Sequence, residues 1–183
     1  MKKKMKEEIQ RAEKEADVTI VMPQMGIEYE LQPTEEQKVL YRKMIDWGAD
    51  VIFGGHPHVI ELAEVFEKDG DKKFIIYSMG NFISNQRMEI MDNKWPERGL
   101  FMDVTFEKSN GKTIIKTVKA HPTLVYSKLN GRCVNGIALY DYKVMILEDF
   151  IVGGKHRDKL DEKMKKKVDI AYKEMMEHVN LKW

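Results

Sequence analysis

The chain has few of the features that mark secreted, membrane-spanning or nucleic-acid-binding proteins. Cys133 is its only cysteine, so no intrachain disulfide forms and cysteine usage does not identify a compartment. No apolar run approaches the roughly 18 residues that a membrane-spanning helix needs. Neither sign of charge predominates, because 31 basic residues face 30 acidic ones and leave a formal net charge of +1. This balance excludes the basic footprint of a nucleic-acid-binding protein, and we expect no transmembrane segment in this chain.

The rest of the composition is that of one ordinary globular domain. Hydrophobic residues make up 43% of the 183 positions and charged residues 33%, enough for a core and a hydrated surface. The first 17 residues are charged and lack the apolar centre of a secretory signal. We therefore expect the chain as written to be soluble, with its localisation unknown.

Two histidines lie one residue apart just after a predicted buried strand. Residues 50–54 form a short apolar run ending in glycine, which is typical of an interior strand of an α/β sheet. Gly55 allows a sharp turn, and Pro57 is predicted to hold His56 and His58 in an extended geometry. The imidazoles would then lie at the carboxyl edge of the sheet, where such folds bind ligands. The alternative is a pair of histidines that merely cap a turn.

The preceding segment predicts a third side chain at the same edge. Val18–Met22 reads as a buried strand and residues 23–33 as a loop. Thr34–Gln37 is a capping box that begins a helix, and Gly48 can end it. Strand, helix and strand make one right-handed crossover, so Gln24 should lie beside the histidine turn.

Other segments complete a mixed α/β reading. An apolar stripe predicts a helix over residues 2–16, and it consists of Met1, Met5, Ile9, Ala12 and Ala16. Asp-Gly and Asn-Gly pairs predict two antiparallel hairpins, over residues 60–77 and 100–120, in one mixed sheet. A lysine-rich amphipathic helix is expected from Asp158 onward.

Three motifs together resemble one known family. Gly48–Val59 reads GADVIFGGHPHV, Gly26–Tyr29 reads GIEY, and Tyr77–Ile83 reads YSMGNFI. In order and spacing they are similar to the closing motifs of the CapA/PgsA family of bacterial capsule and poly-γ-glutamate biosynthesis proteins, over about residues 17–125. The resemblance implies the C-terminal part of a calcineurin-like metallophosphoesterase fold, in which the Gly-His-x-His turn supplies metal ligands.

The resemblance also implies roles for particular residues. Divalent manganese, zinc or iron would be held by His56, His58 and Gln24. His58 and Glu28 are the predicted catalytic residues, and Tyr29 and Asn81 would contact the substrate or orient a ligand. The alternative is that Glu28 and Tyr29 are loop residues and that Asn81 caps a turn.

This chain departs from the family pattern in two respects. The Asp, Gly-Asp and Asn-His motifs with which family members open are absent, so the predicted metal site is incomplete. Gln24 stands where the family tends to have histidine, and an amide oxygen is a poorer ligand for zinc or manganese. We therefore assign residues 1–152 to a CapA-like metallophosphatase-type domain without its first motifs, and residues 153–183 to a C-terminal amphipathic helix.

Three functions remain open on the sequence alone. The first is a CapA-like capsule biosynthesis protein with a partial metal site, working with the capsule polymer machinery. The second is a catalytically silent interaction subunit of a polymer synthesis or export complex. The third is a metal-dependent hydrolase completed by a separate N-terminal half or by a second copy of the chain. Family members are often membrane-anchored and extracytoplasmic.

Overall fold

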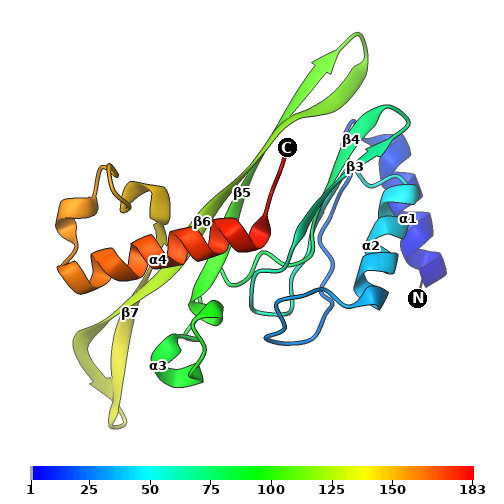
Figure 1. The fold of residues 1–183 in the computed structure, drawn as a ribbon. Helices are drawn as coiled ribbons and strands as arrows, with labels where there is room; N and C mark the ends of the chain where they lie inside the picture. The colour runs from blue at the N-terminus through cyan, green and yellow to red at the C-terminus, as the bar shows by residue number, and fades with distance from the viewer. Residues whose placement is uncertain (1) are drawn as a thin grey trace.

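The computed structural model describes residues 2–183 and contains two β-sheets with helices on their outer faces (Figure 1). The helices are α1 (Lys2–Glu15), α2 (Glu35–Asp46), the one-turn α3 (Met88–Met91) and α4 (Glu162–Val179), with 3-10 turns at Trp95–Glu97, Leu147–Asp149 and Arg157–Lys159. The strands are β1 (Ile20–Val21), β2 (Val51–Phe53), β3 (Ala63–Lys68), β4 (Asp71–Ile76), β5 (Arg98–Ser109), β6 (Lys112–Val134) and β7 (Ile137–Ile146). No helix among the described residues is long and apolar enough to cross a membrane.

The first sheet is mixed and has the strand order β1-β2-β4-β3. β1, β2 and β4 are parallel neighbours, whereas β3 and β4 form the expected antiparallel hairpin. The predicted capping box begins α2, because the Thr34 hydroxyl accepts the Gln37 N–H while the Gln37 side chain accepts the Thr34 N–H. α2 therefore connects β1 to the parallel strand β2, which places the segments that follow these two strands at one edge of the sheet.

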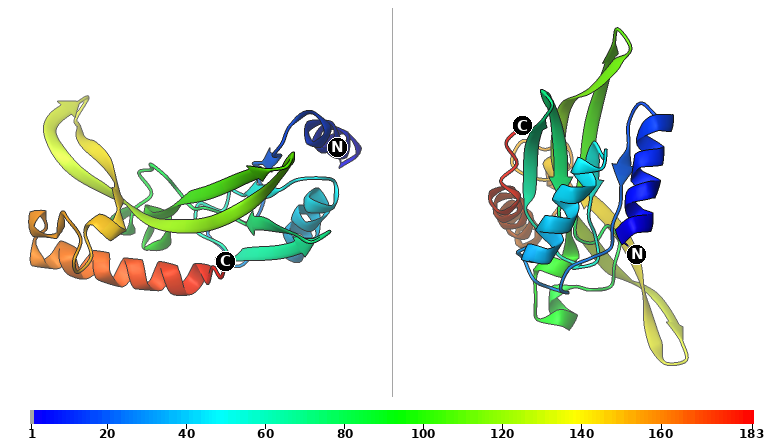
Figure 2. Two further views of the ribbon diagram at one scale, coloured as in Figure 1. Left: turned by 90° about the horizontal axis from the view of Figure 1, so that it is seen from above. Right: turned by 90° about the vertical axis from the view of Figure 1, so that its right-hand side faces the viewer.

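The second sheet consists of three antiparallel strands in the order β5-β6-β7. β6 is 23 residues long and pairs with β5 along its first half and with β7 along its second half. Both hairpins extend beyond the body of the molecule at opposite ends of this sheet, and the β6–β7 hairpin curves away from α4 (Figures 1 and 2).

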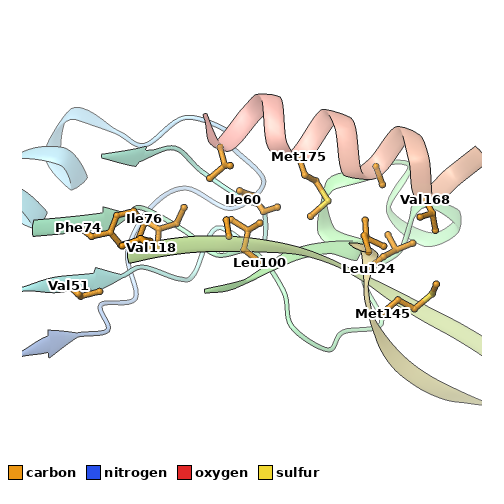
Figure 3. Packing of buried hydrophobic residues seen from close by; sticks show 14 of the residues in the cluster. Val51, Ile60, Phe74, Ile76, Leu100, Val118, Leu124, Met145, Val168 and Met175 are labelled. Atoms are coloured by element: carbon orange, nitrogen blue, oxygen red, sulfur yellow. The ribbon is translucent and has the colours of Figure 1, made fainter. Parts of the chain in front are cut away.

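Both faces of the first sheet are buried, and each belongs to a different apolar cluster. Ile52 and Ile75 face α1 and α2, and pack with Ile9, Tyr41 and Met44. Val51, Phe74 and Ile76 point the other way, toward the second sheet and the buried face of α4 (Figure 3). Side-chain alternation along a strand accounts for this division. The buried face of α4 consists of Val168, Ala171, Met175 and Val179.

Several sequence expectations need correction. Val18–Met22 is not a buried strand, because only residues 20–21 are paired and β1 lies at the sheet edge, where Ile20 and Met22 are 46% and 64% exposed. The second predicted hairpin belongs to a separate sheet. Asn135-Gly136 marks a third hairpin, β6–β7, which the sequence reading missed although it contains the same turn signal. Met1, assigned to the first helix, lies outside the described residues.

Candidate functional site

Backbone hydrogen bonds hold the loop after β1 against the turn after β2. Gly55 N–H donates to Pro23 O at 3.0 Å and Met25 N–H donates to Gly55 O at 3.1 Å, which extends the parallel pairing by a bridge between Gln24 and Gly55. Further along the loop, Tyr29 N–H donates to Pro57 O at 2.8 Å. The predicted adjacency of Gln24 and the histidine turn is confirmed.

The histidine turn is left-handed rather than extended. His56 has φ 98° and His58 has φ 61°, and Tyr29 on the facing loop has φ 66°. Proline does disfavour the right-handed α region for His56, but here the alternative is a positive φ rather than a strand geometry. Non-glycine residues in this region cost about 1–3 kcal/mol each and persist where surrounding contacts determine them, often at functional sites. The hydrogen bonds from Tyr29 and from Asn81 to this turn are such contacts.

A cavity of about 230 Å³ lies at this edge of the sheet. It brings together four of the predicted site residues: Gln24, His56, His58 and Asn81. Its other lining residues are Met22, Phe53, Gly54, Gly55, Met79 and Gly80. The strand ends of β1, β2 and β4 therefore converge on one concave surface.

Asn81 determines which nitrogen of His58 is free. Its Oδ1 lies 2.9 Å from His58 Nδ1, and its Nδ2 donates to His58 O, Gln86 Oε1 and Pro96 O at 3.3, 2.9 and 2.8 Å. Three acceptors around Nδ2 fix the orientation of the amide, so Oδ1 accepts a hydrogen bond from His58 Nδ1–H. The lone pair of His58 is then on Nε2, the arrangement found when a histidine binds a metal and a neighbouring group orients it.

Tyr29 and Gln86 form the side of the site away from Gln24. The Tyr29 ring stacks on His58 with centroids 6.0 Å apart, and its hydroxyl accepts a hydrogen bond of 3.1 Å from Gln86 Nε2. Gln86 thus joins Tyr29 to Asn81. The sequence reading did not single out Gln86, since a glutamine after a strand end has no distinguishing local signal.

The side chains of Glu28 and of a third histidine, His121, lie outside the cavity. Glu28 is exposed and does not line the cavity, although it neighbours Tyr29. His121 lies within β6, where its Nδ1 is 2.9 Å from Glu148 Oε1. Neither side chain adds a donor to the cavity.

The cavity is lined by all three of the predicted metal ligands. They are His56, His58 and Gln24, and among residues 2–183 no group of three or more His, Cys, Asp or Glu side chains has an arrangement that could hold a metal ion. The His56 and His58 ring centroids are 6.5 Å apart. Zinc–nitrogen bonds of about 2.0–2.1 Å would put two rings on one tetrahedral cation about 5 Å apart. One shared cation thus requires the rings to approach by about 1 Å.

Comparison with known proteins agrees with the motifs at this site. The model of the bacterial capsule synthesis protein family PGA_cap matches residues 1–86, a shorter range than the resemblance predicted. The chain is 44% identical over 78 residues to PGA biosynthesis protein CapA of Bacillus subtilis (strain 168), and this match covers 43% of the chain and 20% of that protein. It is 39% identical over 71 residues to capsule biosynthesis protein CapA of Bacillus anthracis, covering 39% of the chain and 16% of that protein.

The chain thus spans about a fifth or less of the length of these two relatives. The matched range contains α1, α2, the first sheet and every residue of the candidate site, including Gln86. This N-terminal part of the chain, residues 1–86, thus matches the CapA-type bacterial capsule synthesis protein family.

Proposed function

We propose that this chain acts in bacterial capsule biosynthesis and that its histidine turn is part of a divalent-metal site of the calcineurin-like metallophosphoesterase type. The observation that supports the metal site best is the bond between His58 Nδ1 and Asn81 Oδ1, because it leaves the lone pair of this cavity-lining imidazole on Nε2.

His56, His58 and Gln24 would hold manganese, zinc or iron, with Asn81 orienting His58 and Tyr29 packed on its ring. When bound, such a metal supplies an activated water and a clamp for phosphate-like oxygens. His58 is the proposed catalytic residue of this chain. Glu28 remains a proposed catalytic residue only for a substrate that extends out of the cavity, since its side chain is exposed outside the lining.

Metal binding is tested by replacing each histidine with asparagine, which tolerates the left-handed backbone of this turn. In calorimetric titrations with manganese or zinc, His56→Asn and His58→Asn are each expected to weaken binding by at least about tenfold, because each removes one imidazole donor. Asn81→Ala is expected to weaken metal binding by about tenfold, because the His58 ring would no longer be held in a fixed orientation.

The matched control is His121→Asn, which removes a histidine outside the cavity and should leave the affinity unchanged. Unaltered binding in both turn variants would refute the metal site. We also expect hydrolysis of p-nitrophenyl phosphate by the metal-loaded chain alone to stay at background. Three donors are too few to hold two cations and also orient the attacking water.

A second candidate, an interaction subunit without catalytic activity, is favoured by exposed apolar side chains near the cavity. Met22 on its rim is 64% exposed, and Phe82 and Ile83 beyond Asn81 are 59% and 61% exposed. β1, which directly precedes Met22, is an edge strand of two residues with no strand paired on its outer side among the described residues. Edges and apolar patches of this kind favour association with a second copy or with a separate N-terminal half.

Association through this surface is expected to be sensitive to charge. Light scattering at high micromolar concentration should show oligomers of the unmodified chain, and Ile20→Glu with Met22→Glu should shift them to monomer, because two carboxylates would then have to be desolvated at the interface. Val152→Glu is the control, since Val152 is 77% exposed but lies far along the chain, after the second sheet. A monomeric unmodified chain that also fails to bind a CapA N-terminal segment would exclude this role.

A further inference from the structure

A buried polar cluster lies directly beneath the loop and turn of the candidate site. Glu61 has 0% exposure, and its Oε2 accepts a hydrogen bond of 2.7 Å from Gln37 Nε2. The same Gln37 amide group donates to Tyr77 O at 3.2 Å. Gln37 is itself fully buried. Its side chain, from α2, therefore connects Glu61, three residues after His58, to Tyr77, which follows β4.

Two buried oxygens of this cluster lack a partner among the described residues. They are Glu61 Oε1 and Tyr41 Oη. An ionised carboxylate can only accept hydrogen bonds, whereas a protonated one also donates. Burial raises the pKa of Glu61 to about 7, and the bond from Gln37 opposes that shift only in part. Glu61 therefore holds a proton in much of the folded protein near neutrality.

Within residues 2–183, no charged side chain forms an ion pair with Glu61. The ion pair between Arg42 and Glu64 is contacted by the Tyr77 hydroxyl. Burial also raises the pKa of the Tyr41 and Tyr77 hydroxyls, which keeps both neutral. On the side facing α4, His178 Nε2 lies 3.0 Å from the carbonyl oxygen of Ile60. The carboxyl of Glu61 is thus solvated by neutral groups alone.

The site loop covers this cluster. A Cβ built on Gly26 would lie 2.7 Å from Pro57 Cγ and 3.1 Å from Gln37 Oε1, so the loop backbone rests on both the histidine turn and the Gln37 amide. Gly26 has φ 133°, which suits glycine and lets the chain approach this closely. Lifting residues 24–29 would uncover Gln37 and admit water toward Glu61.

We propose that Glu61 is a positioning residue of the site: its neutral form is accommodated beside the Gln37 amide under the closed loop, whereas its ionisation favours opening of residues 24–29, which lets water reach the carboxylate. The opening of the loop does not depend on the proposed function. Only one consequence does, namely that metal affinity falls when the loop opens. The coupling itself depends on the packing of Glu61, Gln37 and Gly26.

The direction of the pH effect follows from linkage. The closed state binds the proton more tightly than an open state in which the pKa of Glu61 has its ordinary value of 4.5. The stability of the closed loop is therefore fully present below about pH 4.5, is lost as pH rises toward about 7, and is constant above that.

Hydrogen exchange of the metal-free protein tests the coupling. The Met25 and Tyr29 amides report the loop, because they donate to Gly55 O and Pro57 O. After correction for intrinsic exchange, their opening constants are expected to rise by about fiftyfold between pH 5 and pH 8. In Glu61→Gln, which keeps the shape and the acceptor for Gln37, they should change less than about twofold.

Amides of the β6–β7 ladder near Leu129, far from Glu61, serve as the reference and should show no such dependence in either protein. Loop amides with the same opening constant at both pH values in the unmodified protein would overturn the proposal, as would an equal pH dependence in Glu61→Gln. Because no metal is present, failure of the metal site would not alter these results. A manganese titration at the two pH values then tests the consequence for binding separately.

Discussion

Gly54→Ala is expected to destabilise the fold by about 4 kcal/mol or more, which is a large part of the stability of a small domain. A Cβ at this position would lie 1.9 Å from the carbonyl oxygen of Tyr77, an atom of the neighbouring strand backbone that cannot move aside alone. Gly54 also donates its N–H to Ile76 O at 2.8 Å and accepts from Met79 N–H at 3.1 Å, so separation would break the contact between β2 and β4. Urea unfolding followed by circular dichroism measures the loss.

Gly55→Ala is the matched control. Its Cβ would meet Gln24 Nε2 at 2.6 Å, the far end of a flexible side chain, and we expect a cost of about 1 kcal/mol or less. The same variant should displace Gln24 from the cavity and weaken metal binding. Equal stability of the two variants would show that the strands can separate at Gly54 without penalty.

Met175→Ala is expected to destabilise the whole protein by about 2–4 kcal/mol in a single transition. Met175 is fully buried on α4 and packs in the cluster that also contains residues of both sheets, including Phe74 and Leu124 (Figure 3). Truncation therefore leaves a cavity at the place where three elements meet. Ile170→Ala on the same helix is the control and should cost no more than about 0.5 kcal/mol, because Ile170 is 55% exposed.

The shape of the unfolding curve also tests the predicted division of the chain at residue 153. If residues 153–183 were an independent helix, Met175→Ala would melt that segment first and leave the sheets folded. One cooperative transition, displaced to lower urea, would show that α4 and the preceding residues form a common core.

Local patterns in the sequence were enough to predict most elements and the location of the site. Thr34–Gln37 specified the start of α2 through a capping box whose two bonds are both present. The Asp69-Gly70 and Asn110-Gly111 pairs predicted the hairpins β3–β4 and β5–β6. Connectivity alone placed Gln24 beside the histidines, because consecutive parallel strands end at one edge of a sheet.

Long-range contacts decided what those patterns left open. Whether the hairpins share one sheet depends on which strands meet in space, and β5–β6–β7 pair only with one another as a sheet. The exposure of Ile20 follows from the edge position of β1, which no property of the strand itself indicates.

The sequence by itself was enough to identify the two histidines as candidate ligands, the glycines that allow the close turn, and the family motifs around them. Tertiary structure decided the left-handed turn at His56 and His58, the tautomer of His58, and the burial of Glu61 beneath the site. The physical reason is one of range: caps and turns depend on neighbours a few residues away, whereas Asn81 and Gln37 act on groups 23 and 24 residues distant along the chain.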